Sequence, residues 1–125
     1  MAHKLSDLIM QGAKLRAQHK NGYFILTKGA IASCAMGAAV EALGYQPEAF
    51  LADDSLDTFF RESLLIRNML SEAIGYSIRS AAPTTLLAAY PDMPEDWRSV
   101  HTVCVYLNRK FRHETTARIL ADYGL

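Results

Sequence analysis

Apolar positions recur along most of this chain with the spacing of amphipathic helices. Between residues 55 and 74 they fall at three- and four-residue intervals, which places them on one broad stripe of a helix. Similar stripes predict helices over residues 100–108 and 113–123. A Ser6 cap with Asp7 in the first turn predicts a helix over residues 6–19, and Pro83 and Pro91 bound a short helix over residues 84–89. No segment shows a clear strand pattern with a partner. The pattern therefore predicts an all-α domain, a bundle of five to six helices.

The stretch from Gly29 to Gly44, GAIASCAMGAAVEALG, consists almost entirely of small side chains. At about 100° per residue, Met36, Val40 and Leu43 share one narrow arc, and the other directions present hydrogen, methyl, hydroxyl or thiol groups. Gly37 in a helix interior costs about 1 kcal/mol relative to alanine, which close backbone contact with a crossing helix would offset. We expect this stretch to be the central packing helix of the bundle.

One arginine interrupts the apolar stripe of residues 55–74. Arg67 falls in the middle of the apolar arc, and Glu41 is the single charge of the small-residue helix. An unpaired buried charge is very costly. We therefore predict a structural buried pair between Glu41 and Arg67. The alternative is a solvent-exposed Arg67 on a bent helix.

Composition and charge describe an ordinary globular chain. Its 125 residues are 50% apolar, and thirteen basic side chains balance thirteen acidic ones, so no net field attracts nucleic acid or an anionic membrane. Both ends are basic and the middle is acidic, which favours ends that lie over the middle; a local basic patch is the alternative. We expect residues 1–125 to form a single helical domain. Without a signal peptide or an apolar run of about 18 residues, a cytoplasmic protein with no membrane contact is expected.

Candidate catalytic and metal-binding residues are few. His101 and Cys104 have the spacing of two ligands on one helical face, and Cys34 and His113 could complete a zinc site, but the paired knuckles typical of zinc sites are missing. The helical peroxidase-type thiol proteins carry C-x-x-C followed by histidine, whereas Gly37 stands three residues after Cys34. We therefore expect no metal, no cofactor and no catalytic residue.

Four bulky residues with strand preference, Tyr23, Phe24, Ile25 and Leu26, lack an obvious partner strand. They fit either a buried extended linker or an edge that pairs with another subunit. With Trp97 they are the candidate interface, because aromatic side chains are favoured interface anchors. The main expectation is a non-enzymatic protein that acts through protein–protein contacts as a homo-oligomer.

A second hypothesis concerns the helix pair over residues 98–123. Its short turn is basic, as in a small helix-turn-helix protein that binds DNA. The turn lacks the common glycine, Asp122 would face phosphate, and the chain is neutral, so an antiparallel helix hairpin is favoured. The candidate DNA contacts are Arg109, Lys110, Arg112, Thr115 and Arg118.

A small-molecule sensor or enzyme with a pocket beside the glycine helix is the third hypothesis.

Three pieces of the chain resemble a group of small helical proteins found in bacterial and phage genomes. These pieces are Lys4-Leu5-Ser6 opening a helix that holds Gly12, the segment Ser33–Ala39 with the pattern S-C-A-x-G-A-A, and Tyr106-Leu107-Asn108 in the closing helix pair. The resemblance implies an all-helical fold and a bacterial or phage origin. It implies no catalytic residues and no function.

Overall fold

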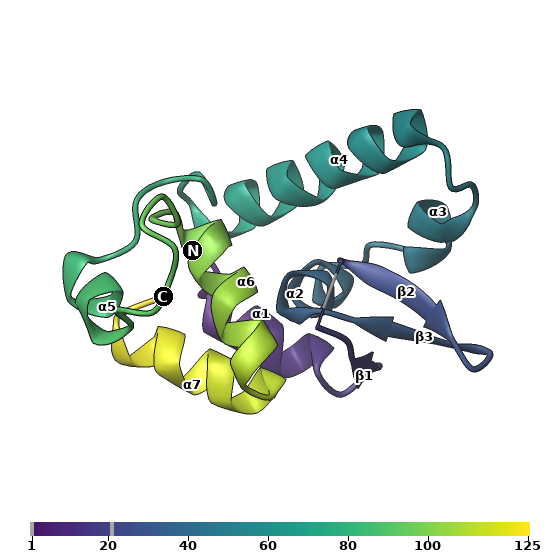
Figure 1. Ribbon diagram of the computed structural model, residues 1–125. Coiled ribbons are helices and arrows are strands. Elements are labelled where there is room, and N and C mark those ends of the chain that lie inside the picture. The colour runs from purple at the N-terminus through teal and green to yellow at the C-terminus, as the bar shows by residue number, and fades with distance from the viewer. Residues whose placement is uncertain (1, 21) are drawn as a thin grey trace.

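A small mixed sheet accompanies the helices in the computed structural model, which describes residues 2–20 and 22–125 (Figure 1). In these residues the sheet order is β1-β3-β2, with β1 parallel and β2 antiparallel to β3. The prediction of an all-α domain is therefore wrong, and the fold is α/β. The strands are β1 (Ala17–Gln18), β2 (Phe24–Thr27) and β3 (Ala30–Ser33). The helices are α1 (Leu5–Gly12), α2 (Ala35–Ala42), α3 (Pro47–Leu51), α4 (Leu56–Ile74), α5 (Thr84–Ala89), α6 (Val100–Lys110) and α7 (His113–Asp122).

The β2–β3 hairpin accounts for the first part of the stretch that was predicted to be one helix. Thr27 pairs with Ala30, and the two residues between them, Lys28 and Gly29, both have positive φ, 52° and 78°. Two positive φ values are typical of the turn that matches the twist of a two-residue hairpin. The helix starts only after Cys34, whose Sγ accepts a hydrogen bond from the Gly37 amide at 3.4 Å.

The remaining small residues form α2, which lies between the sheet and α6 (Figure 1). A Cβ atom at Gly37 would overlap the carbonyl oxygen of Tyr23. A Cβ atom at Gly12 of α1 would overlap the carbonyl oxygen of Ala38 in α2. Close approach of neighbouring backbones to α2 is therefore confirmed, although the backbone that meets Gly37 belongs to Tyr23, before β2, and not to a crossing helix.

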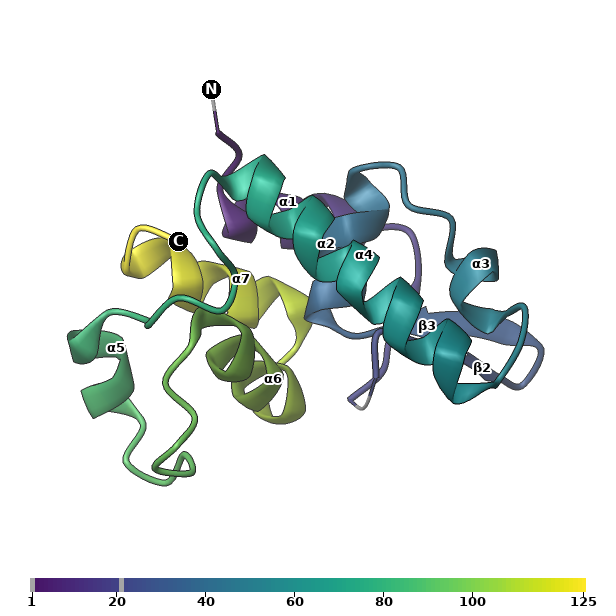
Figure 2. The same ribbon diagram turned by 90° about the horizontal axis from the view of Figure 1, so that it is seen from above.

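The predicted first helix, residues 6–19, is shorter than expected: α1 ends at Gly12, and β1 then joins the sheet. The long helix α4 agrees with its stripe. The Ser55 hydroxyl caps its N-terminus by accepting from the Thr58 amide, and Gly75 ends it with a left-handed φ of 81°. It runs along one side of the molecule over α2 and α3 (Figure 2).

The closing helix pair is confirmed. In α6, Ser99 and Thr102 form a reciprocal capping box, and α7 follows after a short turn. Among the described residues, no helix is both long enough and apolar enough to cross a lipid bilayer.

Candidate functional site

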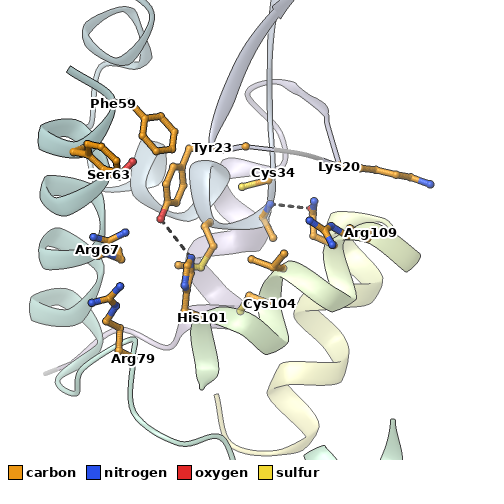
Figure 3. A pocket seen from close by; sticks show the side chains of 16 residues that line it. Lys20, Tyr23, Cys34, Phe59, Ser63, Arg67, Arg79, His101, Cys104 and Arg109 are labelled. Atoms are coloured by element: carbon orange, nitrogen blue, oxygen red, sulfur yellow. Dashed lines mark hydrogen bonds between the residues drawn. The ribbon is translucent and has the colours of Figure 1, made fainter. Parts of the chain in front are cut away.

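A partly enclosed cavity of about 410 Å³ lies between α4, α6 and the first turn of α2 (Figure 3). Cavities of a few hundred Å³ accommodate small organic ligands. This cavity stands beside the N-terminal end of the small-residue helix, where Cys34, Ala35 and Met36 line it. Its wall is built from segments that are distant in sequence.

Two arginines form the positive end of this pocket. Arg67 on α4 and Arg79 in the segment after α4 both extend toward the side where Tyr23 and His101 meet (Figure 3). The Tyr23 hydroxyl lies 3.4 Å from His101 Nε2, within hydrogen-bonding distance. Among the described residues, no Asp or Glu lines the pocket, and none lies within ion-pair distance of either arginine. Two like charges are thus placed together without a carboxylate.

Burial and the positive charges of Arg67 and Arg79 shift the pKa values of the neighbouring His101 and Tyr23. Burial lowers the pKa of His101, and the guanidinium groups of Arg67 and Arg79 lower it further. Burial raises the pKa of Tyr23, and the two arginines oppose that rise. At neutral pH, His101 is therefore a neutral imidazole and Tyr23 a neutral phenol, so the arginines supply the positive charge.

A buried hydroxyl without a partner lies next to these groups. Ser63, one turn before Arg67 on α4, is only 2% exposed, and its Oγ has no hydrogen-bond partner among the described residues. Its side chain points from α4 toward the ring of Tyr23 (Figure 3). Leaving a buried hydroxyl unsatisfied costs about 1–3 kcal/mol. A ligand oxygen at this position would remove that penalty.

Aromatic and apolar side chains form the rest of the wall near this end. Tyr23, Met36 and Phe59 line the pocket, and Phe60 stands at its rim with its ring 5.6 Å from that of Phe59. Phe59 is 45% exposed and Phe60 62% exposed. An apolar ligand body would cover these rings while its charged end faces the arginines.

Both cysteines of the chain line the pocket, and both are free thiols. Burial raises the pKa of Cys34 to about 11 and moves the pKa of Cys104 well above its ordinary value. Thiols in this state are protonated at neutral pH and poor nucleophiles. His113 does not line the cavity, and no three His, Cys, Asp or Glu in the described part of the chain are placed to hold a metal ion.

Asn108 fixes two walls of the pocket to each other. This α6 residue is 2% exposed. Its Oδ1 accepts from the Ala35 amide of α2 at 2.9 Å and from Gln18 Nε2 at 3.1 Å, while its Nδ2 donates to the His19 carbonyl at 3.0 Å. Buried side-chain networks of this kind define one arrangement when every member is satisfied. The first turn of α2 is thus held against α6.

The predicted pair between Glu41 and Arg67 is wrong. Glu41 pairs instead with Arg16, whose Nη2 lies 2.9 Å from Glu41 Oε2. Arg16 follows α1, where the chain bends toward β1 and brings the guanidinium against α2. Arg67 is half-buried and faces the pocket.

The candidate interface residues occupy several different environments. Tyr23 and Phe24 belong to the core, at 9% and 4% exposure, while Ile25 is half-buried and Leu26 is 63% exposed. Because residues 24–27 pair with β3, they are neither an isolated linker nor a strand without a partner in the chain. Trp97 is half-buried beneath the guanidinium of Arg109.

The candidate DNA contacts lie on the confirmed helix pair, and DNA binding stays a prediction. Arg109 lines the pocket, and Lys110 lies 4.8 Å from the centre of the Tyr106 ring. Arg112 and Arg118 are exposed, and Thr115 is half-buried.

Sequence reasoning noticed several pocket residues but did not connect them. Arg67 lies on the apolar arc of its predicted helix, and Tyr23 and His101 were considered as a candidate interface residue and a candidate metal ligand. Arg79 was missed, because it lies in an irregular segment where periodicity gives no signal. Models of protein families, curated proteins and solved structures were compared with this chain, and none matches it. Its function is therefore inferred from the pocket.

Proposed function

We propose that this protein binds a small organic anion in the pocket beside α2. The observation that carries the proposal is the convergence of Arg67 and Arg79, without a carboxylate, beside the unpartnered hydroxyl of Ser63. Guanidinium groups hold carboxylate or phosphate through strong charge-assisted hydrogen bonds. An anion would offset the two like charges and accept from the serine.

The pocket supports one orientation of such a ligand. Its carboxylate or phosphate would lie between the guanidinium groups of Arg67 and Arg79, and its apolar body would lie against Tyr23, Met36 and Phe59. Because the pocket thiols are protonated at neutral pH, the chemistry available favours binding without a covalent step.

Titration calorimetry with a charged probe and its neutral analogue tests this proposal. We expect biphenyl-4-carboxylate to bind at least about tenfold more tightly than biphenyl-4-carboxamide, because only the carboxylate pairs with the arginines. Arg67→Gln and Arg79→Gln should each weaken the carboxylate about tenfold, or by about 1.4 kcal/mol. Arg118→Gln, on the exposed face of α7, is the matched control and should change nothing. Equal affinity for the two probes, or indifference to Arg67→Gln, would refute the proposal.

Protein–protein contact is a second candidate function, and one observation favours it. Five of the eight exposed large apolar side chains lie on α4. Exposed large apolar side chains gathered on one helix are typical of an interaction surface. We propose self-association through α4, in the cytosol, where buried free thiols such as Cys34 and Cys104 persist. The five residues are Leu56, Phe59, Phe60, Leu64 and Leu65.

Light scattering after size-exclusion chromatography tests self-association separately from ligand binding. Leu56 and Leu64 do not line the pocket, so replacing both with Gln should give a monomer that still binds the carboxylate probe. Leu15→Gln, at a position 54% exposed elsewhere, should leave the assembly unchanged. A wild-type chain that is monomeric at all concentrations would exclude this second function.

A further inference from the structure

We infer that the ligand of the pocket is a dianion, with two anionic groups held apart by an apolar spacer; this rests on the proposed binding of an organic anion. The reason is that cations line both ends of the cavity. Arg67 and Arg79 stand at one end, and Arg109 stands at the opposite end, beyond His101 and Cys104 (Figure 3).

The second cationic end is held in place without being neutralised. The Arg109 guanidinium carbon lies 5.3 Å from the centre of the Trp97 ring. An aromatic face positions a guanidinium but leaves its full charge available. Lys20 lines the same end, although its side chain extends away from the cavity in Figure 3. In the described part of the chain, no carboxylate is within ion-pair distance of either residue.

The wall between the two ends has few polar groups that could bind a charged group of the ligand. It includes Met36, Cys104 and Val105, whose side chains are apolar or, for the thiol, neutral. The Asn108 amide at this level is already engaged with the Ala35 amide and the His19 carbonyl. A methylene or aromatic spacer suits this section, and a third charge does not.

The distribution of charge supports a ligand that carries more than one negative group. Lys20 also lines an adjoining depression near the turn between α6 and α7. Together the two hollows are lined by six of the thirteen Lys and Arg residues and by none of the thirteen Asp and Glu residues. In a chain without net charge, this separation produces a local positive potential that a dianion matches better than a monoanion. The six residues are Lys20, Arg67, Arg79, Arg109, Lys110 and Arg112.

Matched monoanions and dianions test the inference by titration calorimetry. The probes are biphenyl-4-carboxylate against biphenyl-4,4′-dicarboxylate, and benzoate against terephthalate for a shorter spacer. We expect the dicarboxylate of at least one pair to bind about tenfold or more tightly than its monocarboxylate. Arg109→Gln should remove that preference by weakening dicarboxylate binding about tenfold more than monocarboxylate binding. Arg109→Lys keeps the positive charge and should retain most of the dicarboxylate preference. Arg118→Gln should have no effect on binding.

The outcomes separate this inference from the proposed function. If monocarboxylates bind and depend on Arg67, but neither pair shows a dianion preference, the dianion inference is wrong and anion binding stands. The dianion inference is also wrong if the preference persists in Arg109→Gln. If no carboxylate binds, or if Arg67→Gln has no effect on any probe, both fail. Circular dichroism of each variant establishes that it is folded.

Discussion

At the scale of single residues, Arg16 and Arg67 show the difference between a paired cation and a cation without a carboxylate partner. Arg16 pairs with Glu41, whose side chain is 9% exposed, whereas Arg67 stands beside Arg79 without a carboxylate. The helical wheel placed Arg67 correctly on the inward arc. It assigned the wrong partner because it could not show that the segment after α1 leaves the helix and carries Arg16 to α2.

Replacing Arg16 with Met should destabilise the fold. The change leaves the Glu41 carboxylate largely buried without its partner, although water reaches the site because the Arg16 side chain is 29% exposed. We therefore expect a loss of about 1–2 kcal/mol in the free energy of unfolding, below the value for fully buried pairs. Urea denaturation measures it, with Arg118→Met as control. The double replacement of Arg16 and Glu41 by Met should lose less than the two single losses added; strict additivity would deny the interaction.

Replacing Arg67 with Gln should leave stability unchanged or raise it by up to about 1 kcal/mol. The substitution removes a like charge from the neighbourhood of Arg79, and no ion pair is broken. Binding sites hold such unfavourable arrangements because the ligand compensates for them. Thermal unfolding without ligand is the measurement. A loss of more than about 1 kcal/mol would mean that Arg67 serves the fold rather than a ligand.

At the scale of elements, the chain shows which structures local pattern can reveal. The stripes of α4, α6 and α7 identify those helices, because each depends on the periodic burial of its own side chains, whereas α5 is identified by the prolines that bound it. The β2–β3 hairpin was missed. Ala30 and Ala32 favour helix locally, and pairing with residues 24–27 overrides that preference. The available signal was the pair Lys28-Gly29 between two strand-length runs.

A substitution in the Lys28-Gly29 turn tests whether this turn stabilises the β2–β3 hairpin. Lys28 adopts a φ of 52°, which asparagine tolerates better than lysine does. Lys28→Asn should therefore stabilise the protein by about 0.5 kcal/mol. Lys14→Asn, at another exposed position, serves as the control for loss of a lysine. Urea denaturation that shows a loss on Lys28→Asn would contradict the turn geometry.

The packing of α1 against α2 predicts a much larger effect. A methyl group at Gly12 would meet the Ala38 carbonyl, a backbone atom that cannot turn aside. We expect Gly12→Ala to cost about 3 kcal/mol in the free energy of unfolding, at the upper end for overpacking. Gly124→Ala is the comparison: its φ is 80° in open space, so only backbone strain of about 1 kcal/mol applies. Equal losses in the two variants would show that α1 and α2 are not in close contact.

At the scale of the whole molecule, the pocket is a product of tertiary structure. Its charged residues come from α4, from the segment after it, from α6 and from the approach to β2, and no two of the basic ones form a sequence motif. Periodicity can say that Arg67 faces inward. It cannot say that Arg79 arrives at the same place, because that depends on how residues 75–82 cross the molecule. Composition offered only the alternative of a local basic patch.

The half-buried His101 and the buried His113 make the stability of the whole molecule depend on pH. Burial lowers the pKa of both His101 and His113, and Arg67 and Arg79 add to the effect at His101. An unfolded histidine has a pKa near 6.5, so below about pH 6.5 the unfolded chain binds more protons than the folded one. Stability should therefore be complete well above pH 6.5 and should fall as the pH drops through 6.5 toward the lowered folded-state pKa of each histidine.

Urea unfolding at a series of pH values between about 7.5 and 5 measures this dependence, and His101→Gln should flatten part of it. A bound anion strengthens the test. A carboxylate placed beside Arg67 and Arg79 favours protonated His101 and so raises the pKa that burial and the arginines had lowered. With saturating biphenyl-4-carboxylate, the acid-induced loss should be smaller than without it, and the affinity of the probe should increase as the pH falls. A probe that binds with the same pH dependence to wild type and to His101→Gln would place the anion away from this histidine.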